Sequence, residues 1–276
     1  MSFKIPYFII YLLKKLKIYE LSKKIYRNYF LYSGILKNDI ESIIFYRSTN
    51  IKHGLFLDVG CFKGSKIDQF LNINIKLKII GIEPFEKYFK KLVLKYKNFP
   101  NVEIYNYAIS NNKFLKKKFF YNKKKIDKEA FSLIKSQKLD KFTYVKVYKL
   151  DNFITRKPQI VKIDTEGSEF SVIKGAKKII NKYRPIFFIE VTNLTLKKIL
   201  REFDKNEYLV FVYEYTFFKK KLKNNWINNN IIKSNIFEKK IYKPEDILKN
   251  TNKEYMFNLI CFPKECEKIF EDLYNN

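Results

Sequence analysis

The sequence predicts an α/β fold, in which a mostly parallel sheet is covered by helices on both faces. Short apolar runs alternate with segments of helical spacing from residue 55 to residue 213, and this alternation is typical of β-α-β units. The runs are apolar throughout, as expected for strands that are buried on both faces. A chain of 276 residues can bury roughly three quarters of its unfolded surface around one core.

Residues 1–50 precede this alternation and differ from it in pattern. Apolar and basic clusters alternate between Tyr7 and Ser33 without a Gly or Pro break, which predicts one or two amphipathic helices. Such a helix can pack on the domain, which we favour, or residues 1–30 can lie on an anionic membrane surface. The sequence therefore divides into a helical extension, 1–50, and a main domain, 51–276.

The longest apolar run near the start is too short to span a membrane. Ile5 to Leu13 holds nine residues, about half of what a spanning helix needs, and no small-residue cleavage site follows it. The three cysteines lack any paired short spacing, which argues against disulfides and a structural zinc site and fits a reducing compartment. We expect a cytoplasmic protein, with peripheral membrane contact as an alternative.

The main domain reads as a series of strands and helices in regular alternation. Each predicted strand is a short apolar run that stops at a turn, whereas each predicted helix spaces its apolar residues three or four apart. Strands are expected at 55–59, 78–82, 102–109, 160–164, 186–191, 208–213 and 257–262, and helices at 66–71, 85–96, 168–183 and 194–203. Segments 111–147 and 214–255 interrupt the series, and we expect them to form walls on the substrate side.

The basic charge of the chain suggests an anionic partner, but its composition weakens that interpretation. The chain carries 56 basic and 28 acidic residues, a net charge of +28. Only five of the basic residues are arginine, although the forked guanidinium is the usual side chain for gripping phosphate. The lysines are scattered over nearly every segment, as expected of an AT-rich coding sequence. We therefore treat a nucleic-acid partner as a minor alternative.

Polar residues end the first predicted strand, where ligands bind in a sheet of this kind. The run from Asp58 to Gly64 forms a D-x-G-x-x-x-G loop, whose two glycines let backbone amides approach a ligand. Asp58 stands where a dinucleotide fingerprint has its first glycine, and a carboxylate there would repel a pyrophosphate. The loop suits a cationic ligand, and Cys61 within it either fills the tight turn or touches that ligand.

Glu83 closes the second predicted strand, 25 residues after Asp58. An acidic side chain at about this separation takes the hydroxyls of an adenosine ribose. Together the two acids indicate adenosine without phosphate. S-adenosylmethionine combines adenosine with a sulfonium cation and a zwitterionic tail, so we expect it to be the cofactor.

A third strand terminus carries the densest group of charges, in the run Lys162-Ile163-Asp164-Thr165-Glu166-Gly167-Ser168-Glu169. With the Asp58 loop and the Glu83-Pro84 pair, this run resembles the FkbM-type S-adenosylmethionine-dependent methyltransferases, which typically show D-V-G-x-x-x-G, an acid-Pro pair and K-I-D-x-E-G-x-E. The resemblance covers roughly residues 54–213. Many members carry Asn where this chain has Phe62, so we expect loop backbone to supply that polar contact.

The resemblance implies a class I (Rossmann-like) methyltransferase sheet of seven strands, the last one antiparallel. It also implies methyl transfer to a hydroxyl, often on a sugar or a natural product, so a glycan or small-molecule acceptor is expected. The predicted cofactor contacts are Asp58, Gly60, Cys61, Gly64, Glu83, Pro84, Ala108 and Asp164.

Three carboxylates are candidates to take the proton of the acceptor, because all should project from strand ends into one crevice. They are Asp164, our first choice, with Glu166 and Glu190. The same three could instead bind a divalent cation, which we do not favour. Glu166 and Glu169 could also simply complement the dipole of the following helix.

Two other functions remain as alternatives. An RNA methyltransferase would use the positive charge for phosphate contacts, but the sequence lacks the Asn/Asp-Pro-Pro-aromatic tetrapeptide that stacks on a base. A non-catalytic member could bind the cofactor, or a membrane surface through its N-terminal helix.

Overall fold

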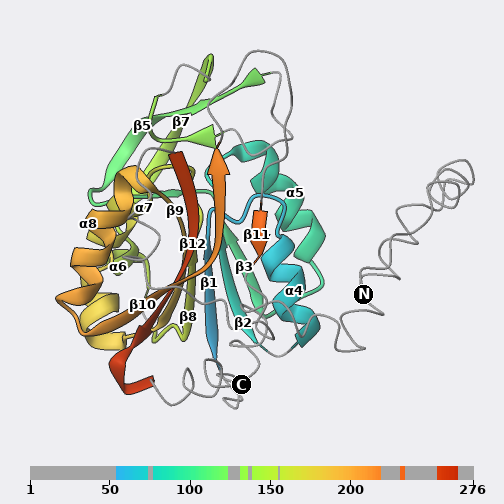
Figure 1. The fold of residues 1–276 in the computed structure, drawn as a ribbon. Coiled ribbons are helices and arrows are strands. Elements are labelled where there is room, and N and C mark those ends of the chain that lie inside the picture. Colours follow the sequence, from blue (N-terminus) through green and yellow to red (C-terminus); the bar gives the residue numbers. More distant parts are fainter. Residues whose placement is uncertain are drawn as a thin grey trace, which may run out of the picture.

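A sheet of eight strands forms the centre of the computed structural model, in the order β11-β10-β12-β9-β8-β1-β2-β3 (Figure 1). The structure describes residues 54–73, 77–123, 131–135, 139–154, 156–218, 231–233 and 254–266, so the predicted helical extension at 1–50 lies outside the described residues. The strands are β1 (Leu55–Val59), β2 (Lys78–Ile82), β3 (Val102–Tyr105), β8 (Ile160–Ile163), β9 (Ile186–Thr192), β10 (Tyr208–Phe218), β11 (Ile231–Lys233) and β12 (Glu254–Pro263).

The predicted sheet of seven strands is confirmed, together with its antiparallel last strand. β3, β2, β1, β8 and β9 pair in parallel, whereas β12 runs antiparallel to both of its neighbours, β9 and β10. The eighth strand, β11, pairs antiparallel with the far part of β10. The sequence did not indicate β11, because three residues within a polar stretch are too few to show a period.

Helices cover both faces of the sheet, and successive residues of a strand enter opposite cores. On one face Phe56 packs on Phe70, with ring centroids 4.1 Å apart, and on the other Phe187 packs on Phe203 at 5.1 Å. The first face carries α4 (Ser65–Ile73) and α5 (Glu86–Tyr96), and the second carries α6 (Leu150–Phe153), α7 (Glu169–Lys174) and α8 (Asn193–Asp204) (Figure 1).

The single long helix predicted after the fourth strand was wrong, because the chain breaks at Gly175. A π-helical turn, Ile179–Tyr183, follows the break. A Cβ at position 175 would lie 2.3 Å from the backbone oxygen of Ser110, so a close approach of two chain segments requires glycine there. The carboxylate of Asp151 accepts a 2.8 Å hydrogen bond from the backbone N–H of Lys178 and so starts the second helical piece.

A second, smaller sheet stands over the carboxyl ends of the main strands, near the top of Figure 1. The strand predicted at 102–109 divides at Asn106, whose side-chain amide donates to the backbone oxygens of Glu83 and Pro84. Its second part therefore joins the small sheet. The order is β4-β7-β5-β6, formed by β4 (Ala108–Ile109), β5 (Phe114–Tyr121), β6 (Phe131–Ser132) and β7 (Lys141–Tyr148).

All three cysteines are free thiols. Within the part of the chain that the structure describes, no helix combines the length and the apolar character needed to cross a membrane.

Arg184 ties three chain segments together at the edge of the fold. Its guanidinium donates to both carboxylate oxygens of Glu265, at 2.6 and 2.9 Å, and to the backbone oxygens of Asn206 and Glu207. It also lies 5.1 Å from the ring centroid of Tyr208. A planar fork can make these contacts at once, whereas a single ammonium cannot.

We expect Arg184→Lys to lower the free energy of unfolding by about 1–3 kcal/mol, because charge-assisted hydrogen bonds to two carbonyl groups are lost. Urea denaturation measures the change. Arg201→Lys, at an exposed position of α8, is the matched control and should shift stability by less than about 0.5 kcal/mol. Equal effects of the two substitutions would contradict a role for the fork.

Candidate active site

A cleft opens between the carboxyl ends of the central strands and the small sheet. The space between its lining atoms is about 790 Å³, open solvent included. Its floor is formed by β1, β2 and β8 with the loops that follow them. Its opposite side is lined by Phe119, Phe131 and Leu133, which belong to the chain segment of the small sheet. Segment 111–147, which we expected to form a wall, contributes these three side chains.

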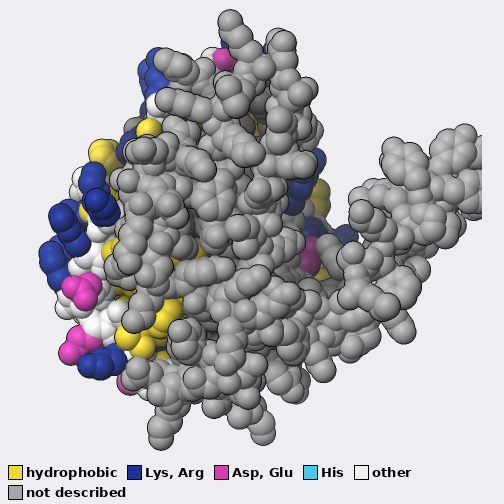
Figure 2. Space-filling model, in the orientation of Figure 1, with side chains coloured by type: hydrophobic (Ala, Val, Ile, Leu, Met, Phe, Trp, Pro, Cys, Tyr) yellow, Lys and Arg dark blue, Asp and Glu magenta, His cyan; other side chains and the backbone are white. Residues whose placement is uncertain are grey.

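The charge of the cleft is opposite to the charge of the chain. Four carboxylates but only two lysines line the cleft, although basic residues outnumber acidic ones by 56 to 28 in the whole sequence. Figure 2 shows Lys and Arg side chains on the outer surface instead, along the edge formed by α8. The lining charges are Asp58, Glu83, Asp164 and Glu166 against Lys66 and Lys162.

Gly60 brings the ends of β1 and β8 into close contact. Its φ is +86°, and a Cβ there would lie 1.8 Å from the backbone oxygen of Asp164. The backbone N–H groups of Gly60 and Cys61 both donate to the oxygen of Ile82. Only glycine fits this conformation and this approach, and Asp164 is held beside the loop as a result.

Glu83 is a buried carboxylate that fixes two loops at once. Its Oε2 accepts a hydrogen bond from the backbone N–H of Phe62 and its Oε1 accepts one from that of Phe85, each at 2.8 Å. Burial raises the pKa of Glu83 to about 7; the two N–H groups oppose the rise and the nearby charge of Asp58 adds to it. Each oxygen still has a lone pair with which to accept a ribose hydroxyl.

Phe62 adopts a left-handed conformation, with φ of 46°, which Asn tolerates and bulky residues rarely adopt. Its backbone N–H donates to Glu83, and the expectation that loop backbone supplies the missing polar contact stays a prediction. Its ring packs 4.4 Å from that of Tyr88 and 6.1 Å from that of Phe131. The aromatic contacts thus hold the loop against the small sheet where a polar side chain is lacking.

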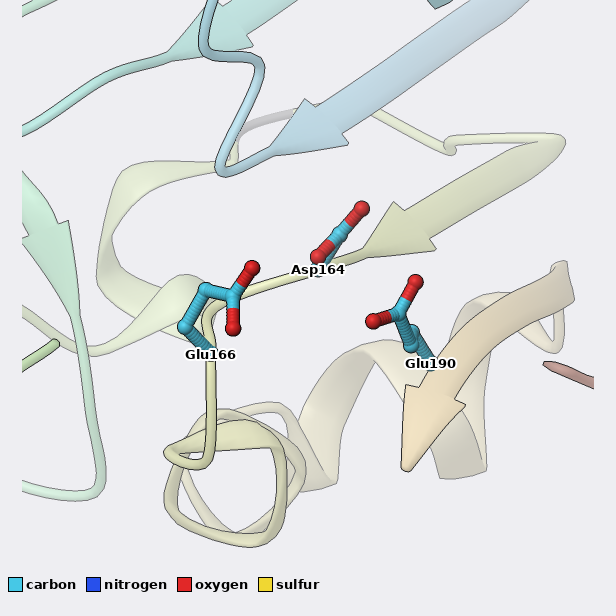
Figure 3. A group of neighbouring side chains, drawn as sticks. All are labelled: Asp164, Glu166 and Glu190. Carbon is cyan, nitrogen blue, oxygen red and sulfur yellow. The ribbon is translucent and has the colours of Figure 1, made fainter. Parts of the chain in front are cut away.

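The three predicted catalytic carboxylates converge at one edge of the cleft. Asp164 follows β8, Glu166 lies on the next loop and Glu190 lies on β9, with the side chains pointing toward one another (Figure 3). One oxygen of each lies within 4.8 Å of the others. Acids so close can share a proton or surround a cation. The geometry permits both roles considered in the sequence analysis, removal of a proton from the acceptor and binding of a divalent cation.

Lys162 reaches the same group from within β8. Its ammonium donates to Oδ2 of Asp164 at 2.9 Å, and the residue is buried. In the sheet Lys162 pairs in register with Asp58 of β1. Lys162 therefore lies between the acid of the β1 loop and the group of three carboxylates. The contact orients the carboxylate of Asp164 and leaves its Oδ1 for another donor.

Glu169 holds the loop that carries Glu166. Its Oε1 accepts from the backbone N–H of Thr165 and of Gly167, at 3.0 and 2.9 Å, and from the Thr165 hydroxyl. Burial raises its pKa, against these hydrogen bonds. Glu169 therefore positions the loop, while Glu166 is exposed, with a left-handed φ of 53° that presents its side chain to the cleft.

Most of the predicted cofactor residues line the cleft, including Cys61, Pro84 and Ala108. Gly64 does not; it lies at the start of α4, where a Cβ would meet the Tyr96 hydroxyl at 2.3 Å. Its role as a cofactor contact stays a prediction. The sequence analysis did not single out the following lining residues: Val59, Ser65, Lys66, Ile82, Tyr107, Ile109, Phe131, Leu133, Thr165 and Ser168.

Tyr107 and Ile109 could have been predicted, because they follow the carboxyl end of β3. The same rule, that ligands bind at the carboxyl ends of the strands, led to Asp58 at the end of β1. The three apolar residues of the small sheet could not be predicted, because apolar residues in a strand give no sign of which surface they cover.

Residues 58–218, more than half of the chain, match the family described as Methyltransferase FkbM domain. No curated protein resembles the chain closely enough to match. Among solved structures, the chain is similar to Methyltransferase FkbM from Methylobacillus flagellatus KT, with 18% identity and a TM-score of 0.38, covering 50% of this chain and 33% of that one. The chain thus spans about a third of the length of that protein.

Two further structures match over a larger share of both chains. Precorrin-6y C5,15-methyltransferase from Geobacter metallireducens GS-15 is 12% identical with a TM-score of 0.41, covering 80% of this chain and 87% of that one. An rRNA methylase from Streptococcus thermophilus is 9% identical with a TM-score of 0.38, covering 76% and 87%. At such values they say nothing about the activity of this chain.

We expect Gly60→Ala to destabilise the protein clearly more than Gly167→Ala. Both glycines have positive φ, which costs an alanine roughly 1–2 kcal/mol. At position 60 the new methyl would also collide with backbone, whereas at 167 its nearest neighbour is the Ile134 Cδ1 at 4.0 Å. Thermal and urea unfolding of both variants measure the difference. Equal losses of stability in the two variants would contradict the prediction and would show that the ends of β1 and β8 can move apart to accept the methyl group.

The raised pKa of Glu83 makes stability depend on pH. The native state favours the neutral carboxyl, so its contribution is complete below the unfolded pKa and is lost as pH rises through about 7. Without ligand, the free energy of unfolding should fall by roughly 1–3 kcal/mol more in the wild type than in Glu83→Gln between about pH 5 and 8. Urea titrations at several pH values measure both slopes; parallel slopes would contradict the prediction.

Proposed function

The chain belongs to the methyltransferase FkbM domain family, and from this premise we propose that it transfers the methyl group of S-adenosylmethionine to a hydroxyl of a sugar, a glycan or a small natural product. The observation that carries the proposal is the acidic cleft. In a chain with twice as many basic as acidic residues, the cleft reverses this ratio. A net negative pocket attracts a ligand that carries a cationic centre.

The residues of the cleft fit this cofactor. Glu83 and Asp58 lie on adjacent strand ends and offer acceptors, one to the ribose hydroxyls and the other to the ammonium group of the methionine part. Gly60 lets the loop after β1 approach the backbone of Asp164, which brings Asp58 and Asp164 to the same cleft. Phe62 and Phe131 add apolar surface of the kind on which an adenine ring packs.

Bound S-adenosylmethionine would supply a methyl group already activated by the positive sulfur beside it. The protein then has to align the acceptor oxygen and to remove its proton. Asp164 suits the second task, since it lines the cleft and Lys162 holds its Oδ2 in place. The carboxylate of Asp164 would take the proton of the acceptor hydroxyl as the acceptor oxygen bonds to the methyl carbon and the bond between that carbon and sulfur breaks, with its electron pair going to the sulfur.

Glu166 and Glu190 support Asp164 in this proposal. One oxygen of each lies within 4.8 Å of an oxygen of Asp164. The alternative is that the three carboxylates hold a divalent cation that activates the acceptor hydroxyl instead. We favour direct proton removal, because the ammonium of Lys162 already occupies one oxygen of Asp164.

Calorimetry should detect binding of S-adenosylmethionine to the wild type, and Glu83→Ala and Asp58→Ala should each weaken it at least about tenfold through loss of hydrogen bonds to charged groups. The matched control is Glu86→Ala, an exposed glutamate on α5, which should bind as the wild type does. Failure of the folded wild type to bind would contradict the assignment of the cofactor.

Asp164→Asn should lower kcat, measured at saturating cofactor, by about 10²–10⁴-fold, the usual range for loss of a general base. Labelled S-adenosylmethionine with panels of sugars and small hydroxyl compounds provides the assay, and Asp204→Asn, at an exposed site on α8, is the control. A chelator should leave the activity unchanged. Loss of activity in chelator and its recovery with magnesium would favour the metal role for the three carboxylates.

A further inference from the structure

The outer face of the small sheet combines exposed aromatic rings with lysines. Seven large hydrophobic side chains are exposed in the part of the chain that the structure describes, and five of them lie in this sheet or directly beside it: Phe114, Leu115, Ile134, Phe142 and Tyr144. Phe142 is 47% exposed and Tyr144 50%. Of the five, Phe142 and Tyr144 lie on the outer face itself, and exposed apolar side chains beside one another indicate an interaction surface.

The alternation of β5 and β7 separates this face from the cleft. Phe119, Val145 and Val147 are buried against the core beneath the sheet. In the antiparallel register, Lys118 stands opposite Tyr144 and Phe120 opposite Phe142, so these pairs point outward. We call the outward set the lysine–aromatic face; it consists of Lys116, Lys118, Phe120, Phe142, Tyr144 and Lys146.

The charge of the sheet is strongly one-sided. The described residues 108–123, 131–135 and 139–148 contain eight lysines and a single carboxylate. That carboxylate, Asp140, accepts a hydrogen bond from the backbone N–H of Lys123. The sheet therefore complements an anionic partner far better than the cleft below it does.

The geometry of the rings discriminates between anionic partners. The ammonium of Lys116 lies 4.3 Å from the ring centroid of Tyr144, and that of Lys118 lies 4.5 Å from that of Phe142. Phe142 also meets Phe120 and Tyr144 edge to face. A nucleic acid or a sugar chain needs open ring faces on which to stack, and here a cation covers one face of each of the two rings.

Lipid headgroups need a different arrangement, which this face provides. Rings and lysine stems enter the apolar boundary of a bilayer together, while the ammonium groups stay at the level of the anionic headgroups. Charge attraction and buried apolar area then add to the binding. We propose that the lysine–aromatic face docks the protein on an anionic lipid surface. This contact is separate from the one expected of residues 1–30 and does not depend on the proposed function.

The test is co-sedimentation of the full chain with vesicles of phosphatidylcholine alone and of phosphatidylcholine with an equal part of phosphatidylglycerol. The wild type should bind the anionic vesicles and not the neutral ones. Lys116→Glu/Lys118→Glu should weaken binding at least about tenfold. Phe142→Ser/Tyr144→Ser should weaken it by a similar factor through loss of apolar burial. Circular dichroism checks that both variants keep the fold.

The control is Lys197→Glu/Lys198→Glu, which makes the same charge change at exposed positions of α8. It should weaken binding by less than about threefold, because salt screens the attraction between the membrane and charges that lie away from the contact. If the face variant and the control variant lost the same amount of vesicle binding, the binding would depend only on the overall charge of the protein, and the proposal would be overturned. Failure of the wild type to bind anionic vesicles would also overturn the proposal. The same holds if the wild type binds single-stranded RNA and not the vesicles, and if the variants of the lysine–aromatic face lose that RNA binding.

Discussion

The cleft depends on one buried carboxylate more than on any other group. Glu83 bonds two backbone N–H groups, one in the loop after β1 and one at the start of α5. It can do so because both loops lie at the carboxyl ends of adjacent parallel strands, where the strand register brings them together. Its burial is costly, as the raised pKa shows. An amide could not replace the carboxyl group, because each of the two Glu83 oxygens accepts one of the N–H groups and an amide has only one accepting oxygen.

The fold was predictable because buried parallel strands leave a plain signal. Runs such as Leu55–Val59 and Ile160–Ile163 are apolar throughout and stop at polar turns, and the structure confirms both as neighbours in the sheet. The break at Gly175 was not predictable, because its cause is a segment distant in sequence, at Ser110. Strand β11 gave no periodic pattern at all.

The candidate site shows the same division. Asp58, Glu83 and Asp164 were found because strand ends are where such sheets bind ligands. Glu166 was among the predicted catalytic carboxylates and Glu169 was not, but the hydrogen bonds by which Glu169 holds the loop could not be predicted, because they depend on the backbone conformation of that loop. Their roles separate only through the left-handed backbone at Glu166, which turns one side chain outward and lets the other fold back.

The small sheet is formed by one continuous stretch of chain, between Ala108 and Tyr148. The loops that carry Gly60, Glu83 and Asp164 lie before and after it, and none of them belongs to it. A replacement of this stretch would therefore change the roof of the cleft without altering its floor. Because this stretch leaves and rejoins the main sheet as one segment, its lining side chains can change while the loops that carry Gly60, Glu83 and Asp164 stay as they are.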